Sequence, residues 1–313
     1  MKYKNYIFTA IVLSAIVFSQ AFSQAFLIND FSPKVTALGR TGIGMKGDVS
    51  LLFYNPASIE FGKPVQVFAG YTELYPLVKD NNLNVLNAGG AYTFGSLGTV
   101  GIGLSQFSPK FWTERTIVLS YATRMLLENL SLGFSAKLLS WSAEAPQGEY
   151  AVPEPALSKT NISFDAGLLY LIPEILEQND LQIGIAVHDI TQPSVAHNGS
   201  SGAKIPLSAS AGFAFISHLY NYSLFGGASI KETDVRLSAG YEITALKAVA
   251  FGIENEFLVR LGAGRIINND TQGDYNGGFG FRVENLRIDY SYTYQTAVRN
   301  IGGISSISIG YDF

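Results

Sequence analysis

Apolar and polar residues alternate through much of this chain, from about residue 64 to its last residue. A period of two is that of a β-strand whose two faces meet different surroundings. The clearest example is 286–295, where leucine, isoleucine and tyrosine alternate with arginine, aspartate, serine, threonine and glutamine. Comparable segments occupy 130–138, 207–215 and 235–242. Most run for about 9–11 residues, the length that a tilted strand needs to cross a bilayer, so the pattern predicts an all-β protein of long strands.

The closing segment of the chain has one wholly apolar face. Its members are Ile307, Ile309, Tyr311 and Phe313, and they alternate with small or polar residues. A strand of period two that stops on a terminal aromatic residue is typical of the last strand of a bacterial outer-membrane barrel. We therefore expect these four residues to form the C-terminal signal for the barrel-assembly machinery.

A closed barrel accounts for this alternation better than a soluble sheet does. In lipid every backbone polar group has to be bonded within the protein, so membrane strands must close on themselves. The faces with Leu, Ile, Phe and Tyr would contact outer-membrane lipid, and the faces with Gly, Ser and charged residues would line the lumen. A soluble β-sandwich also alternates, but at this size it would have shorter strands and more charge outside. We predict a transmembrane antiparallel β-barrel.

The predicted number of strands is about fourteen. Alternating segments from Val65 onward give about fifteen candidates, whereas bacterial single-chain barrels have an even number and keep both termini in the periplasm. The surplus boundary is expected between Tyr220 and Ile266, where turns are short. Tight connections at 95–96, 128–129 and 284–285 suit the periplasmic side, and longer links, expected outside, are 73–83, 142–160, 189–203, 268–276 and 296–303.

The N-terminus has the pattern of a secretory signal. Lys2 and Lys4 precede an apolar run from Ile7 to Phe18, which is too short to span a bilayer comfortably. Small residues suitable for cleavage follow in Ala21-Phe22-Ser23 or in Ser23-Gln24-Ala25, and we expect the signal peptide to occupy 1–23. An uncleaved membrane anchor is the alternative interpretation. No later segment approaches the ~20 continuous apolar residues of a membrane helix.

Composition agrees with a barrel and excludes several other classes. Only 15% of residues are charged, and the 32 glycines, 17 tyrosines and 21 phenylalanines suit strands that are apolar on one face and carry aromatic girdles. There is no cysteine, so disulfides and thiolate metal sites are excluded. The net charge of -4 argues against a nucleic-acid partner, and the spacing of metal ligands is absent. We expect no cofactor and no metal.

A glycine-rich stretch precedes the first predicted strand and does not alternate. It contains Gly39, Gly42 and Gly44, then Asp48, then Asn55-Pro56-Ala57. Pro56 fixes its own φ and biases Asn55 toward an extended conformation, so this corner is expected to be rigid. An ordinary turn before the first strand is the simpler interpretation.

This stretch resembles the hatch of FadL-like outer-membrane proteins, and it looks closest to the PorV/PorQ branch found in Bacteroidetes. The segments 251–264, 277–290 and 307–313 are similar to the final strands of that family, although Arg40 stands where the family usually has another glycine. The resemblance implies a hatch at 24–62, folded inside a barrel that comprises 63–313. Because lumen width grows with strand number, such a segment would close a pore that would otherwise leak.

The same resemblance implies a non-enzymatic role in type IX protein secretion at the outer membrane. Extracellular links, above all 142–160 and 189–203, would bind cargo proteins or other secretion subunits. A FadL-like channel for hydrophobic small molecules is the competing hypothesis. An outer-membrane hydrolase is a third, because His188-Asp189 ends a predicted strand, but no serine stands out as its nucleophile.

Charged residues on the late strands are expected to face inward. An arginine on the lipid face at mid-membrane costs about 2–4 kcal/mol, so the lumen is the favourable place for them. They could form an ion-pair ladder that braces the wall and the hatch, or a polar constriction that selects solutes. The predicted lumen charges are Arg236, Glu242, Arg260, Arg282, Arg287, Asp289 and Asp312, with Glu254 nearby.

Residues 42–47 match the spacing G-x-G-x-x-G of dinucleotide-binding loops. That site needs a strand before the glycines and a helix after them. Here the preceding segment is polar and the following one runs to Pro56, so we interpret the match as accidental.

Overall fold

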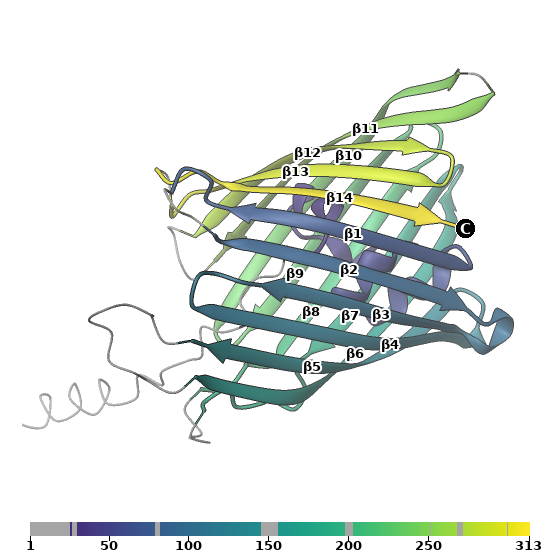
Figure 1. Ribbon diagram of the computed structural model, residues 1–313. Coiled ribbons are helices and arrows are strands. Elements are labelled where there is room, and N and C mark those ends of the chain that lie inside the picture. The colour runs from purple at the N-terminus through teal and green to yellow at the C-terminus, as the bar shows by residue number, and fades with distance from the viewer. Residues whose placement is uncertain are drawn as a thin grey trace, which may run out of the picture.

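The computed structural model describes residues 26, 30–78, 82–144, 156–197, 203–250, 252–267, 272–298 and 300–313. These residues form fourteen antiparallel strands that close into one barrel (Figure 1), which confirms the predicted fold and strand number. No helix in this part of the chain is long and apolar enough to cross a membrane. The predicted signal peptide lies outside the described residues. The strands are β1 (Val65–Leu74), β2 (Asn84–Thr93), β3 (Thr99–Phe107), β4 (Trp112–Leu127), β5 (Leu130–Ala143), β6 (Leu157–Leu176), β7 (Asn179–His188), β8 (Ser208–Ser217), β9 (Tyr222–Lys231), β10 (Asp234–Ala250), β11 (Ile253–Ile266), β12 (Gly273–Val283), β13 (Leu286–Gln295) and β14 (Ile304–Asp312).

The barrel closes where its last strand meets its first. Strand β14 pairs antiparallel with β1, from Gln66 opposite Asp312 to Leu74 opposite Ile304. The backbone N–H of Phe313 adds a hydrogen bond to the carbonyl of Val65 at 2.8 Å. Both ends of the barrel therefore lie at one rim, which is the periplasmic rim in bacterial barrels.

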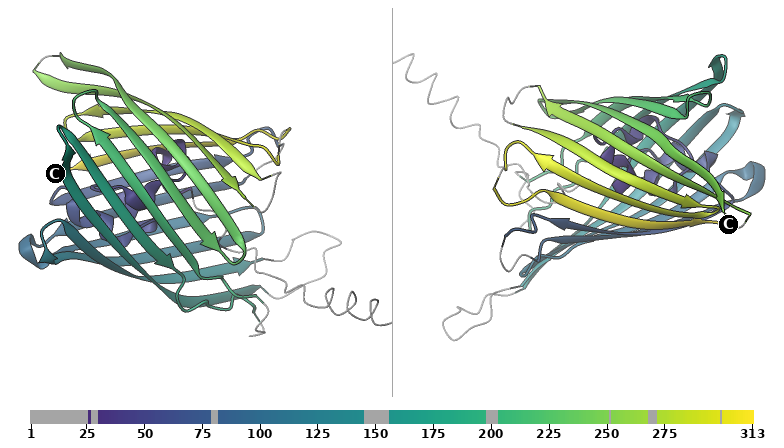
Figure 2. Two further views of the ribbon diagram at one scale, coloured as in Figure 1. Left: turned by 180° about the vertical axis from the view of Figure 1, so that it is seen from behind. Right: turned by 90° about the horizontal axis from the view of Figure 1, so that it is seen from above.

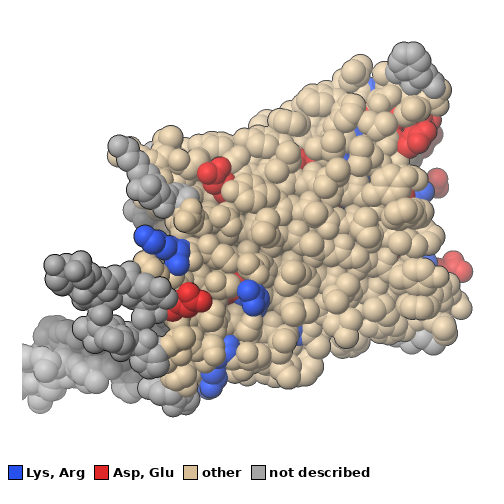
Figure 3. Space-filling model, in the orientation of Figure 1, with Lys and Arg blue, Asp and Glu red and all other residues tan. Residues whose placement is uncertain are grey.

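The outer wall is apolar, as the alternation requires. The four residues of the closing segment, Ile307, Ile309, Tyr311 and Phe313, are 40–65% exposed on the outside. In Figure 3 the charged side chains of the visible face lie mainly toward the two ends of the barrel, with a broad uncharged band between them. A band of this kind contacts the hydrocarbon of a bilayer. The chain is an outer-membrane β-barrel.

The links differ in length at the two rims. At the periplasmic rim, consecutive strands are joined by short connections such as 128–129 and 284–285, whereas the opposite rim carries the longer links. Part of the longest predicted link, 145–155, lies outside the described residues. Some link boundaries were wrong. Strand β6 begins at Leu157, inside the link expected at 142–160, and β12 begins at Gly273, inside the link expected at 268–276, because the inward alternation of β12 already starts at Asp274.

Residues 30–62 lie inside the barrel and are called the internal segment below. Figure 2 shows its short helices enclosed by the ring of strands in two further views. Its apolar side chains form a core with inward residues of the wall, including Phe68, Val118 and Phe225. The helices are α2 (Pro33–Ala37), η1 (Gly42–Gly44), η2 (Val49–Phe53) and η3 (Pro56–Phe61), with η4 (Gly95–Leu97) in a rim connection; the segment's fully buried apolar residues include Val35, Leu38, Val49, Leu51, Leu52 and Ile59.

Candidate functional site

Glycines line the wall wherever the internal segment approaches it. A Cβ added to Gly240 would lie 2.6 Å from the carbonyl oxygen of Leu38, and one added to Gly103 would lie 2.7 Å from side chains of the segment. Because these positions carry no side chain, the backbone or the side chains of the segment lie directly against the barrel wall. We call this set the glycine belt; its members are Gly101, Gly103, Gly133, Gly167, Gly184, Gly212, Gly240, Gly262 and Gly278.

The glycines of the internal segment meet the wall in the same way. Gly39 has a φ of +73°, and its Cβ position lies 2.7 Å from the carbonyl oxygens of Ala239 and Ala263. Gly44 lies equally close to the backbone of Phe213. Gly42 packs on Val35 within the segment. Larger residues at positions 39 and 44 would separate the segment from the wall.

Asn55 and Pro56 form the corner that the sequence predicted to be rigid. The Asn55 side chain donates to the carbonyl of Ile43 at 2.8 Å and to that of Leu168 in β6 at 3.1 Å, and its Oδ1 accepts the N–H of Ala57 at 3.1 Å. Pro56 begins η3, a position where the missing N–H costs nothing. The corner therefore ties two turns of the segment to the wall.

An ion pair joins the internal segment to the closing strands. Arg287 of β13 pairs with Asp48 and also with Asp312 of β14, the latter at 2.9 Å. Burial alone would raise the pKa of Asp48, but Arg287 and then Lys34 outweigh it and hold that pKa below its usual range. Asp48 is therefore ionised at neutral pH, and it also accepts the N–H and hydroxyl of Ser50.

A second ion-pair group lies on the extracellular side of the segment. Arg40 bonds both oxygens of Asp30 at 2.7 and 2.9 Å and reaches Asp274 of β12 at 3.0 Å. Asp274 in turn accepts two bonds from Arg236 of β10, at 2.7 and 2.9 Å. Arg40, which departs from the glycine expected in the resemblance, thus links the segment to the wall.

The remaining predicted lumen charges fall into one tight group and one loose pair. Arg260 is fully buried and bonds Glu242 at 2.6 Å and Asp289 at 2.5 Å. Arg282 is one-third exposed and lies 3.7 Å from Glu256. Glu254 is exposed at the tip region of the β10–β11 hairpin and is not part of either group.

Several residues of the site carried no signal that set them apart in the sequence. Asp274 was expected in a link, and Asp30 and Glu60 were not considered, although Glu60 pairs with Arg124 of β4 at 3.2 Å. Lys137 binds Asp165 and Asp189 at 2.8 and 2.7 Å. Inward alternation places Lys137 and Asp165 in the lumen, but their pairing depends on strand register.

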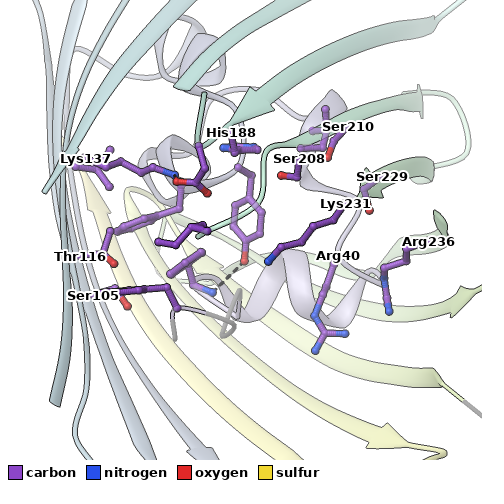
Figure 4. Close-up of a pocket in the computed structure, with 18 of the residues that line it drawn as sticks. Arg40, Ser105, Thr116, Lys137, His188, Ser208, Ser210, Ser229, Lys231 and Arg236 are labelled. Carbon is purple, nitrogen blue, oxygen red and sulfur yellow. Dashed lines mark hydrogen bonds and ion pairs between the residues drawn. The ribbon is translucent and has the colours of Figure 1, made fainter. Parts of the chain in front are cut away.

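A cavity of about 230 Å³ lies between the internal segment and the extracellular rim. Figure 4 shows Lys231, Arg40 and Arg236 on one side of it and Lys137 on another, with the Lys231 ammonium directed into the space. His188 also lines the cavity, and its Nδ1 lies 3.1 Å from Asp165. The walls combine these polar groups with Phe31, Phe53, Phe107 and Val118 and with the hydroxyls of Ser105, Thr116, Ser208, Ser210 and Ser229.

The extracellular mouth is partly covered by the link that follows β7. Trp141 donates its Nε1–H to the carbonyl of Val195 at 2.8 Å and stacks on Trp112 at 4.6 Å between ring centroids. Val195 and Ile205 are buried against this pair. The described part of the link is therefore packed on the ends of β4 and β5.

Comparison with known families gives a match over most of the chain. Residues 49–311 match a family described as type IX secretion system membrane protein PorP/SprF. The PorV/PorQ branch expected from the terminal motifs is therefore not the matching family. Those motifs, a glycine-rich segment and alternating closing strands, are determined by packing inside a barrel, which explains why they did not identify the branch. A search of curated proteins gave no match.

Solved structures of outer-membrane transporters share the fold. The Pseudomonas putida toluene transporter TodX is 12% identical over 92% of this chain and 98% of its own, with a TM-score of 0.58. The Ralstonia pickettii toluene transporter TbuX is 12% identical over 92% and 100%, with a TM-score of 0.53. A FadL homologue from Pseudomonas aeruginosa is 14% identical over 89% and 97%, also with a TM-score of 0.53. At these identities the likeness concerns the fold alone.

Proposed function

Since this chain belongs to the PorP/SprF family of type IX secretion system membrane proteins, we propose that it serves secretion as a plugged barrel that acts through its surfaces and not through its pore. The internal segment occludes the lumen in this proposal. Cargo proteins or other secretion subunits bind at the extracellular rim. The role requires no enzymatic step.

The observation that carries this proposal is the way the internal segment is attached. Ion pairs fix it at three places around the wall, through Asp48, Arg40 and Glu60. The glycine belt brings the segment into close contact with eight strands, through its backbone on five of them and through its side chains on the others. The segment cannot move aside without breaking the largely buried pairs of Asp48 with Arg287 and of Arg40 with Asp274, and loss of a buried pair costs several kcal/mol. A permanently closed lumen leaves the rims and loops as the working surfaces.

The extracellular rim supplies a firm support for binding. The link after β7 is anchored by Trp141 through both its stacked ring and its Nε1–H. Loops that are held on a rigid scaffold are common places for recognition. We assign partner binding to this link and to the neighbouring link between β5 and β6, whose residues 145–155 lie outside the described part.

Deletion of the gene tests the role directly. Cargo of the type IX system should accumulate in the periplasm of the deletion strain, and a plasmid copy of the native chain should restore its delivery to the cell surface. Cell fractionation with immunodetection of one cargo protein measures this. Normal surface delivery without the gene would end the secretion proposal.

A Trp141→Ala copy in the same strain tests the assigned surface. Loss of the ring removes the stacking on Trp112 and the bond to Val195, so delivery should fall while the barrel still resists SDS at room temperature. Phe111→Ala is the matched control, because Phe111 is an aromatic residue at the same rim that is 43% exposed. Equal delivery by both variants would remove this link from the proposal.

Transport of a small molecule is the second candidate. A hollow at β10–β12 favours this function, because residues from both faces of the wall line it. Leu237 and Tyr275 are outward residues of the lining, and Ser238 and Asp274 are inward ones. A hydrophobic solute would have to pass the charges of Arg236 and Asp274 there, which counts against it. Uptake of toluene-like compounds by liposomes that contain the protein would support transport.

A further inference from the structure

Glu114 of β4 is a buried acid near the extracellular end of the lumen. Its side chain is directed away from lipid, and the residue is 8% exposed. Its Oε1 accepts the Nε1–H of Trp112 and its Oε2 accepts the backbone N–H of Phe26, each at 2.8 Å. Within the part of the chain that the structure describes, both partners of this carboxylate are neutral groups. A buried carboxylate without a cation is costly.

Phe26 has a backbone conformation that is unusual for a bulky residue inside a chain. Its φ is +59°, a left-handed conformation that is uncommon for a bulky side chain. Its ring packs on the cluster formed by Leu139, Trp141, Val195 and Ile205. The angle φ is set by the carbonyl carbon of the preceding residue. A residue that begins a chain has no such carbon, and the strain then disappears.

The sequence before Phe26 fits a cleavage site. Ser23 and Ala25 are small residues placed three and one positions before Phe26, which is the pattern that leader peptidases recognise. The other candidate, with Ala21 and Ser23 in those positions, would leave Gln24 as the first residue. Only the first candidate creates an amino group at the atom that contacts Glu114.

We propose that the leader is removed after Ala25, so that the mature protein begins at Phe26 and its α-ammonium forms an ion pair with Glu114. Hydrolysis breaks the Ala25–Phe26 peptide bond. The hydroxyl of water joins the Ala25 carbonyl carbon, and the nitrogen of Phe26 becomes an amine that takes up a proton. The contact at 2.8 Å then becomes a charge-assisted N–H···O bond.

This pair gives the buried carboxylate its missing cation and fixes the start of the chain. Phe26 and Glu114 both line the cavity above the internal segment. A pinned N-terminus therefore closes one side of that cavity, next to the cluster that supports the extracellular link. The proposal concerns maturation of the chain and does not depend on the role in secretion.

N-terminal sequencing of the protein purified from outer membranes tests the cleavage position. Phenylalanine is expected in the first cycle, and the intact mass should be that of residues 26–313. A chain that begins at Gln24 would be heavier by one glutamine and one alanine residue. That result, or a chain that still begins at Met1, would overturn the proposal.

Reactivity of the α-amine tests the ion pair. A free α-amine has a pKa of about 8, and a paired one is more basic, so a rise of one unit slows its reaction with an acylating reagent at neutral pH about 10-fold. Mass spectrometry of the N-terminal peptide should show labelling of the folded native protein at least about 10-fold slower than labelling of Glu114→Gln. Glu144→Gln, which removes an exposed acid at the end of β5, should label at the native rate.

The native protein alone provides a further measurement if the Glu114→Gln variant fails to assemble. Its α-amine should react at least about 10-fold faster after unfolding in urea than in the folded barrel. Equal rates in the folded and unfolded protein would show that the amine is free, and the proposed ion pair would be wrong.

Discussion

Gly262→Ala is expected to displace the internal segment and to convert the closed barrel into a conducting one. A Cβ at this position would overlap the backbone of Leu38 and Gly39 and would lie 2.7 Å from the carbonyl oxygen of Ala37. All three contacts are with the backbone of the segment, so no side-chain rotation relieves them. Overpacking of this kind costs about 1–3 kcal/mol, and more where backbone has to move. Single-channel recording in planar bilayers should show a steady conductance that the native protein lacks.

A neighbouring glycine gives a matched control for this result. Gly277 lies on β12 beside β11 and faces outward, and a Cβ there would have 3.9 Å to its nearest neighbour, in Leu261. Gly277→Ala makes the same chemical change on the opposite face of the wall and should stay non-conducting. If Gly262→Ala also stays closed, and residues 30–62 remain resistant to protease in it, the proposed plugging role of the segment would be contradicted.

The sequence predicted the barrel because strand periodicity is a local property. Each strand alternates between lipid and lumen, so the outward Ile307 and Ile309 and the inward Arg287 and Asp289 can be assigned from neighbours two positions away. The strand number followed from counting such segments and from the evenness of bacterial barrels. These inferences need no knowledge of which strands face one another across the lumen.

The contacts of the internal segment could not be predicted in this way. The partner of Arg40 on the wall is Asp274, more than two hundred residues later, and no local pattern connects them. Gly184, Gly240 and Gly262 are visible as small inward residues in the sequence. That they face the backbone of the segment, and not open water, depends on how residues 30–62 fold across the lumen. The matching family was missed for a related reason. The glycine-rich segment and the alternating closing strands are determined by packing inside a barrel, and they do not indicate which proteins the barrel binds.

Arg260→Met is expected to destabilise the barrel by about 3–5 kcal/mol, because it leaves two buried carboxylates without their cation. Arg260 has no exposed surface and bonds Glu242 and Asp289 at 2.6 and 2.5 Å. Methionine fills a similar volume, so the loss reports charge and hydrogen bonding more than a cavity. The midpoint of urea unfolding in detergent micelles, followed by the mobility shift of the barrel on gels, measures the difference.

Two further variants distinguish the effect of the buried Arg260 ion pairs from the effect of removing any arginine charge. Arg282→Met removes an arginine that is one-third exposed and 3.7 Å from its partner, so it should cost less than about 1 kcal/mol. The triple change Arg260→Met, Glu242→Gln and Asp289→Asn removes the uncompensated charges and should recover much of the lost stability, since an uncharged buried group is often as stable as an ion pair. A triple variant as unstable as Arg260→Met would show that shape, and not charge balance, holds this side of the lumen together. In that case, packing around Leu38 and the glycine belt would stabilise the part of the wall that faces α2.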